Sequence, residues 1–260
     1  DIFMACVHGD MALARRALRE NPGCLDAFVS HGKADSPFAR GTGGNIYNWE
    51  LGHAVRPIPV AAKRGHRELT DFLLGEASDG QRLLSLCLIG DREAVERLLR
   101  HRRDLAATLE EDKARALADA IHFRDREGAR LMLDAGFPTT AKGVDGADAL
   151  HLAAWHGDAE FVRRLIERGA VPGVWHEDGA FLRRLRDRGA ILGNRDNDHA
   201  STPLEAACHG SLHCWDRTQG DYRETIALLV RAGADAGKES AWKKEGRTGW
   251  ASPEAIAAIP

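Results

Sequence analysis

The stretch ALHLAAWHGDAEFVRRLIERGA, residues 149–170, indicates two helices joined by a tight turn. Its first half is rich in alanine and other small or apolar residues, which allow two helices to approach closely. Gly157 suits a left-handed turn at a helix C-terminus, and Asp158 suits the N-cap of a second helix, where its side chain accepts hydrogen bonds from free backbone N–H groups. Apolar residues at helical spacing follow, and Gly169-Ala170 then leads into a polar connector. The stretch therefore predicts a helix, a glycine turn and a second helix.

Similar stretches recur along the chain, so the helix pair is a repeat. Five further segments share the turn, the polar cap and the apolar helical spacing: GDMALARRALRE from Gly9, GHRELTDFLLGE from Gly65, GDREAVERLLRH from Gly90, RDREGARLMLDAG from Arg124 and GDYRETIALLVRAGA from Gly220. A single helix pair cannot bury its apolar face, whereas stacked pairs bury a continuous core. We therefore expect an all-α solenoid of about six helix-turn-helix units.

The spacing of the turn residues places the units and the insertions. Two intervals match a repeat of about 33 residues, two are much longer, and one is short enough to leave room only for a plain turn. We expect a single repeat domain over 1–260 with units near 1–30, 54–78, 80–108, 112–140, 145–172 and 200–237, and with insertions at 31–53, 175–199 and 211–219. Within 238–260, Ser252-Pro253-Glu254 is typical of a helix start and predicts a short capping helix.

Two segments resemble the start of an ankyrin repeat, whose signature is T-P-L-H-x-A followed by G-H or G-D and a closing G-A. They are Leu150-His151-Leu152-Ala153-Ala154 and Thr202-Pro203-Leu204. The resemblance covers the chain from about Ile2 to Asp235, with the unit around residue 150 nearest to the consensus, and implies an ankyrin-repeat solenoid. It also implies that His151 hydrogen-bonds to backbone and holds neighbouring units together. The stretch from Gly41 to His53 and the segment HGSLHCWDRTQGDY from His209 both resemble segments of uncharacterised bacterial ankyrin proteins, and the excess of arginine over lysine is consistent with a bacterial origin.

The resemblance further implies which residues line a binding groove. In an ankyrin array the first helices form a concave face, and the two residues before each turn glycine point into it. This rule selects Val7, His8, Lys63, Arg64, Leu88, Ile89, His122, Phe123, Trp155 and His156, and His209 in the sixth unit, which is one residue shorter. Clusters of exposed aromatic and histidine residues mark interaction sites. We therefore expect a protein–protein interaction module whose partner is another protein, bound in the groove and at the connector tips. Alternatively, the insertions cover this row and make it a minor core.

The insertion at 31–53 is the least repeat-like part of the chain and supports an alternative function. Long structured insertions in regular scaffolds are often functional. Tyr47 and Trp49 lie two residues apart and can face one side of an extended chain as partner-binding aromatics, or they can plug the gap above the first two units. The alternative is a small-ligand-binding or enzymatic site that this insertion builds against the first repeats, with Glu50 and His53 as acid–base partners of His8. Its glycines do not match a phosphate-binding loop.

No motif predicts a cofactor, a metal site or a catalytic residue. The segment Cys208-His209-Gly210-Ser211-Leu212-His213-Cys214 is the only one with many metal-ligand side chains, but only its histidine pair has a spacing that zinc sites prefer. Gly210 and Ser211 are also expected to break the helix that would align the histidines. Zinc-protease and nucleophile-elbow motifs are absent. We expect a non-enzymatic protein with no cofactor and no metal.

Composition bounds the remaining classes of function. A hydrophobic content of 43% and a charged content of 29% are typical of a folded soluble protein. The net charge of −3 gives no electrostatic basis for binding nucleic acid or an anionic membrane. No apolar run reaches the ~18 residues needed to span a bilayer, the first ten residues do not resemble a signal peptide, and the five cysteines are mostly far apart, so we expect a cytoplasmic protein with reduced thiols. The sequence begins at Asp1 rather than Met, which keeps open a third possibility, a structural array inside a larger protein.

Overall fold

The computed structural model describes residues 1–29, 51, 54–143, 146–170, 172, 201–237 and 251–260. Two compact units divide the chain, Asp1–Pro138 and Thr139–Pro260. In the described residues both units consist of helices and turns, and the β-structure is limited to one isolated antiparallel bridge between Val29 and Val55. The fold is thus all-α, as the repeated helix pattern predicts.

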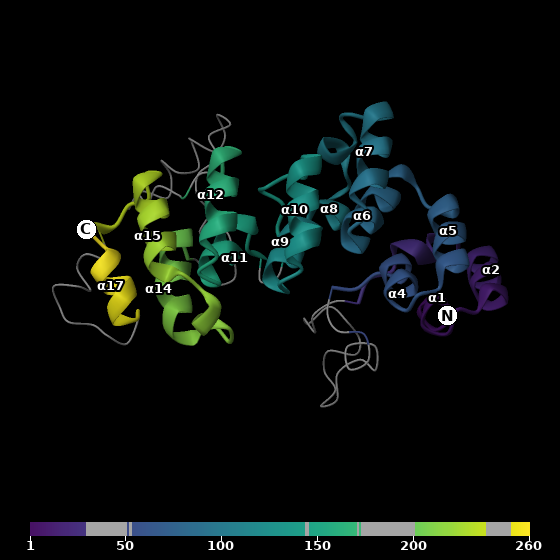
Figure 1. Ribbon diagram of the computed structural model, residues 1–260, viewed down its shortest axis with the longest axis horizontal. Helices are drawn as coiled ribbons and strands as arrows, with labels where there is room; N and C mark the ends of the chain where they lie inside the picture. The colour runs from purple at the N-terminus through teal and green to yellow at the C-terminus, as the bar shows by residue number, and fades with distance from the viewer. Residues whose placement is uncertain (30–50, 52–53, 144–145, 171, 173–200, 238–250) are drawn as a thin grey trace. The chain divides into compact units, whose positions relative to one another are not determined.

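The first unit contains four helix pairs in its described part (Figure 1). The pairs are α1 (Ile2–His8) with α2 (Met11–Glu20), α4 (Pro57–Lys63) with α5 (Arg67–Glu76), α6 (Asp79–Ile89) with α7 (Arg92–His101), and α9 (Ala116–His122) with α10 (Arg126–Ala135). Short helical turns connect them: η1 (Pro22–Asp26), η2 (Leu105–Thr108) and α8 (Glu111–Ala114). Helix α4 packs against both α1 and α6, so the first helices of these pairs stack directly on one another.

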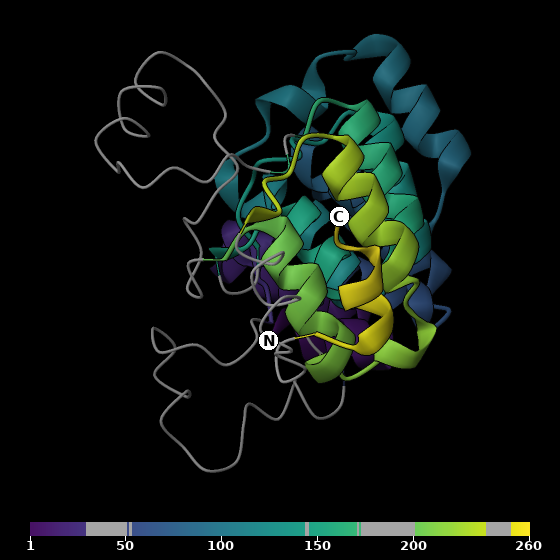
Figure 2. The ribbon, with the colours of Figure 1, turned by 90° about the vertical axis from the view of Figure 1, so that its left-hand side faces the viewer.

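The second unit contains two helix pairs and a terminal helix in its described part. The pairs are α11 (Ala149–Trp155) with α12 (Ala159–Glu167) and α14 (Pro203–His213) with α15 (Tyr222–Arg231), and the turn η4 (Arg217–Gln219) precedes α15. Helix α11 packs along α14, and the terminal helix α17 (Pro253–Ala258) lies beside α14 and α15 (Figure 2). Ser252 caps α17 by accepting the Ala255 N–H at 3.2 Å, which confirms the predicted helix start.

Aspartate caps begin the second helix of five pairs. The carboxylate oxygen accepts the backbone N–H three residues later at Asp10, Asp91, Asp125, Asp158 and Asp221. His66 occupies the equivalent place before α5 but makes no capping bond; its Nε2 instead lies 3.1 Å from the Val7 carbonyl oxygen. This contact ties the second pair to α1, so the one departure from aspartate supports packing rather than the helix start.

His151 connects the two helix pairs of the second unit, as the ankyrin resemblance implies. Its ring is buried, with Nδ1 2.8 Å from Asp148 Oδ1 and Nε2 2.9 Å from the carbonyl oxygen of Ser201. The Asp148 carboxylate also accepts the backbone N–H groups of Leu150 and His151 at the start of α11. At the start of α14, Thr202 and Glu205 form a reciprocal capping box. The prediction of a structural role for His151 is confirmed.

The predicted break at Gly210 and Ser211 is wrong, because α14 runs without interruption to His213. The hydroxyl of Ser211 donates to the Cys208 carbonyl oxygen at 2.6 Å and so bonds to its own helix. Gly210 is needed for packing: a β-carbon there would overlap the backbone of Trp155 in α11. The insertions at 175–199 and at 31–53 apart from Leu51, with Tyr47 and Trp49, lie outside the described residues.

Candidate functional site

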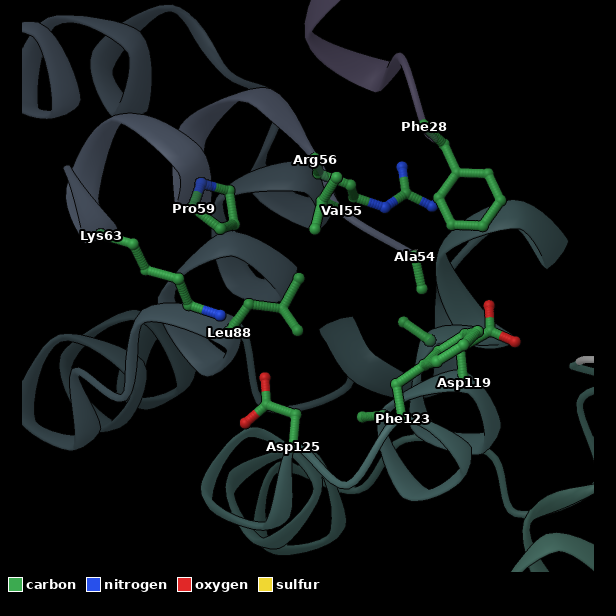
Figure 3. Close-up of a pocket in the computed structure, with 12 residues that line it drawn as sticks. Phe28, Ala54, Val55, Arg56, Pro59, Lys63, Leu88, Asp119, Phe123 and Asp125 are labelled. Atoms are coloured by element: carbon green, nitrogen blue, oxygen red, sulfur yellow. The ribbon is translucent and has the colours of Figure 1, made fainter. Parts of the chain in front are cut away.

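A cavity of about 150 Å³ opens in the first unit among the first helices of three successive pairs (Figure 3). Pro59 and Lys63 come from α4, Leu88 from α6, and Ala116, Asp119 and Ala120 from α9, with Phe123 following directly. Phe28, Ala54, Val55 and Arg56 close one side, and Asp125 lies at the start of α10. The cavity therefore lies on the side of the unit that the first helices α4, α6 and α9 line.

The cavity wall is mostly apolar, and Lys63 is its exposed cation. Lys63 makes no ion pair with any residue in the part of the chain that the structure describes, and its ammonium end points into the opening from α4 (Figure 3). The two carboxylates are engaged: Asp119 is buried and accepts a hydrogen bond from Arg115 Nε at 2.9 Å, while Asp125 accepts the Gly128 N–H at 3.1 Å. Asp119 is therefore paired with a cation, whereas Asp125 keeps its negative charge opposite the positive charge of Lys63.

Arg56 supports the cavity instead of facing a ligand. Its guanidinium is buried, donates to the carbonyl oxygens of Asp112 at 2.6 Å and Asp26 at 3.3 Å, and lies 5.2 Å from the Phe28 ring centroid. Burial lowers the pKa of Arg56 from its ordinary value, although Asp112 and Asp26 oppose this shift. Its hydrogen bonds fix the segment that carries Phe28 against α4, and so fix one wall of the cavity.

Lys113 is a second buried cation near this wall, and its ammonium group forms ion pairs with three carboxylates. Its ammonium lies 2.7 Å from Glu110, 3.2 Å from Asp26 and 3.5 Å from Asp112. Burial alone would lower the pKa of Lys113, but the hydrogen bonds to Glu110 and Asp26 outweigh it and raise the pKa. Lys113 therefore joins α8 to the end of η1 and is not available to a partner.

The insertion at 31–53 leaves and rejoins the described chain beside the cavity. The Val29 N–H donates to the Val55 carbonyl oxygen at 3.0 Å, and the Ala54 N–H donates to the Val29 carbonyl oxygen at 2.8 Å. Phe28, Ala54 and Val55, which flank the insertion, all line the cavity. The described residues on both sides of the insertion therefore line the cavity.

The structure places only some of the residues predicted to line the groove of the first unit in the cavity. Lys63 and Phe123 both line the cavity, and Leu88 lies between them. Arg64 is exposed at the end of α4, and His8 is exposed at the end of α1, outside the cavity lining. His122 is half-buried, with its ring edge-on to Phe123 at 4.8 Å between centroids.

In the second unit, Trp155 starts a row of three rings that contact one another in tilted arrangements. Its ring centroid is 5.6 Å from that of His209, and the His209 ring is 4.3 Å from that of His213. Trp155 and His209 are half-buried, while His213 is exposed. These rings come from the end of α11 and the second half of α14, so the unbroken α14 helix creates the row.

His156 does not lie on the surface, contrary to the expectation that it faces an open groove. Its side chain is completely buried, with Nδ1 2.8 Å from Asp216 Oδ1 and 3.3 Å from Cys214 Sγ. The segment after α14 folds over the ring, and the exposed Trp215 stands edge-on to it at 5.6 Å between centroids. Burial and the hydrogen bond to Asp216 raise the pKa of Cys214 to about 12, so the thiol is not a nucleophile at neutral pH.

Sequence reasoning missed several cavity residues. Ala116 and Ala120 lie on the same helix face as the predicted Phe123, so helical periodicity could have found them. Phe28 and Val55 lie outside the helices, in the segments after η1 and before α4, and have no such signal. Asp119 is buried within a run of alanines and pairs with Arg115 one turn earlier, and the spacing of this pair is visible in the sequence.

Comparison with known proteins supports the fold and the repeat. The family model for the ankyrin repeat matches residues 145–175, which is the unit nearest to consensus. The crystal structure of the human ASB11 ankyrin repeat domain is similar over 99% of this chain and 95% of that chain, with a TM-score of 0.50 and 17% sequence identity. No curated protein matches the sequence. Among the described helices, none is long and apolar enough to cross a membrane. One segment of the chain thus matches the ankyrin-repeat family model, and the fold of the chain is similar to that of an ankyrin repeat domain.

Proposed function

We propose that this protein is a recognition module that holds a segment of a partner protein in the cavity among α4, α6 and α9. Ankyrin repeats generally act as protein–protein interaction modules. The observation that carries the proposal is the cavity itself, a mostly apolar hollow of about 150 Å³ with the exposed Lys63 at its rim. A hollow of this size accommodates a group as large as benzene, which corresponds to one aromatic or branched aliphatic side chain.

The charges around the hollow favour an acidic neighbour for that side chain. Lys63 and the exposed Arg64 lie at the end of α4, and His8 lies at the end of α1, which packs against α4. The carboxylates that line the hollow already accept hydrogen bonds. The partner segment would therefore carry an apolar anchor next to Asp or Glu, with Phe123 and His122 against the anchor and Lys63 near the carboxylate.

Trp155 supplies a separate aromatic contact in the second unit, where its ring lies tilted against that of His209. His156 is not part of the proposed surface because it is buried. Tyr47 and Trp49 are proposed as further contacts, because the described residues that flank their insertion line the cavity.

Selection of binders from a displayed library of random peptides tests the proposal. We expect the selected peptides to share an apolar residue beside an acidic one. Their affinity should fall at least about tenfold for Phe123→Ala and for Lys63→Glu, as expected for central interface residues. The matched controls are Phe72→Ala, a half-buried aromatic on α5, and Arg97→Glu, an exposed cation on α7. Peptides that bind the two groups of variants equally would contradict the proposal.

A second candidate function is a small-ligand or enzymatic site at the same place. It is favoured by one observation, that Phe28 and Val55, which flank the insertion, line the cavity. A thermal-shift screen of small molecules tests it: a ligand that stabilises the wild type but neither Phe123→Ala nor Lys63→Glu would favour this function over peptide binding.

A further inference from the structure

Three buried side chains with metal-binding atoms meet in the second unit. His156 follows α11, whereas Cys214 and Asp216 lie between α14 and η4. Sγ of Cys214 is 2.9 Å from Oδ1 of Asp216 and 3.3 Å from Nδ1 of His156, and this Nδ1 is 2.8 Å from the same carboxylate oxygen. The exposed fraction is 0% for His156 and Cys214 and 4% for Asp216.

These three atoms are a donor set that suits zinc. Imidazole nitrogen, thiolate sulfur and carboxylate oxygen are its usual ligands, with bonds of about 2.0–2.3 Å. Ligand atoms of a tetrahedral site with such bonds lie roughly 3.3–3.5 Å apart. The observed separations of 2.8–3.3 Å approach the edges of one face of that tetrahedron, so only small side-chain shifts are needed to admit an ion.

Charge and burial also fit a divalent cation. A thiolate and a carboxylate together balance two positive charges, so the loaded site would be neutral with a neutral imidazole as the third ligand. Burial excludes bulk water, which strengthens each electrostatic interaction within the site. The ligands join the end of α11 to the segment after α14, so a bound ion would cross-link the two helix pairs of this unit.

We propose that His156, Cys214 and Asp216 form a buried site for a divalent metal of the zinc type. The ion replaces the Cys214 thiol proton, and three protein ligands leave one coordination position for water or another donor. The sequence does not suggest this set, because His156 lies 58 residues before Cys214 and 60 residues before Asp216. The nearby Cys208 is not part of the set. Without metal, hydrogen bonds link the three side chains to one another.

Titration of the tag-free, chelator-treated protein with Co²⁺ tests the proposal directly. Cobalt in such a site gives a thiolate-to-cobalt charge-transfer absorption in the near ultraviolet and visible bands of a tetrahedral ion. We expect one equivalent to bind, both signals to appear, and Zn²⁺ to displace the cobalt. Failure of the wild type to bind, or binding without the thiolate band, would overturn the proposal, and neither result depends on any variant folding.

Variants identify the ligands. Cys214→Ser should abolish the charge-transfer band, and Asp216→Asn, which keeps the side-chain shape, should weaken Co²⁺ binding at least about tenfold. Cys87→Ser, which removes another buried cysteine, and His213→Gln, which removes an exposed histidine near the cluster, should bind as the wild type does. Binding that survives both ligand changes would show an adventitious surface ion and would overturn the proposal.

Discussion

Arg124 adopts a backbone conformation that glycine holds at the equivalent turns. Its φ is 62°, compared with 71° at Gly9, 87° at Gly90 and 62° at Gly157. A side chain in the left-handed region costs of order 1 kcal/mol. Arg124→Gly should therefore raise the free energy of unfolding by about 1 kcal/mol in urea titrations followed by circular dichroism. Arg124→Ala is the control, because it removes the side chain but keeps the β-carbon; equal effects of the two changes would refute the strain argument.

Asp148 should make stability depend on pH. Burial raises the pKa of its carboxyl, but the hydrogen bond and charge of His151 outweigh burial, so the net pKa is below its usual value. A depressed folded-state pKa stabilises the protein above the unfolded-state pKa, and this contribution is lost as pH falls through the folded value. Asp148→Asn keeps the cap and should cost about 1 kcal/mol at pH 7.

The stability difference between wild type and Asp148→Asn should shrink as pH falls below about 4, where unperturbed carboxyls protonate. Urea unfolding at pH 7, 5 and 3 measures it. A difference that stays constant from pH 7 to pH 3 would show that the carboxylate charge contributes nothing.

At the scale of single elements, the contact between α11 and α14 depends on Gly210. A β-carbon at this position would overlap the backbone of Trp155, and backbone cannot move aside as a flexible side chain can. Overpacking of this kind costs about 1–3 kcal/mol, which exceeds the gain in helix propensity of about 1 kcal/mol. Gly210→Ala should therefore destabilise the second unit in thermal unfolding. Gly75→Ala in α5, where a β-carbon meets open space, is the control and should not destabilise.

The sequence predicts most elements correctly because their signals are local. Most helix pairs have a turn glycine, an aspartate cap and apolar residues at helical spacing within about a dozen residues. Such a pair can therefore be predicted from its own residues alone. The continuity of α14 could not be read in this way, since it depends on the packing of Gly210 against Trp155 in another helix. The burial of His156 likewise depends on Cys214 and Asp216, which lie far along the chain.

At the scale of the whole molecule, each unit has a core of its own, and the stability of a repeat array is close to a sum over neighbouring interfaces. Leu84→Ala in α6 removes a fully buried side chain and should cost about 2–5 kcal/mol. Amide hydrogen exchange should accelerate in α4, α6 and α9 more than in α14 and α15. Uniform acceleration in both units would contradict the additive account.

The candidate site was predictable only in part. The family pattern selects Lys63 and Phe123, and the structure brings both to one cavity with Leu88. Phe28 and Val55 escaped prediction because a long insertion separates them in sequence while one antiparallel bridge joins their segments in space. A contact between residues so far apart in the sequence leaves no local periodic pattern from which it could be predicted.

Amide hydrogen exchange with and without a selected peptide tests the central claim, that the partner segment binds among the first helices. The account predicts new protection in α4, α6 and α9 and at Phe123, with the outer helices α5 and α7 unchanged. Protection confined to the outer helices or to the second unit would contradict it.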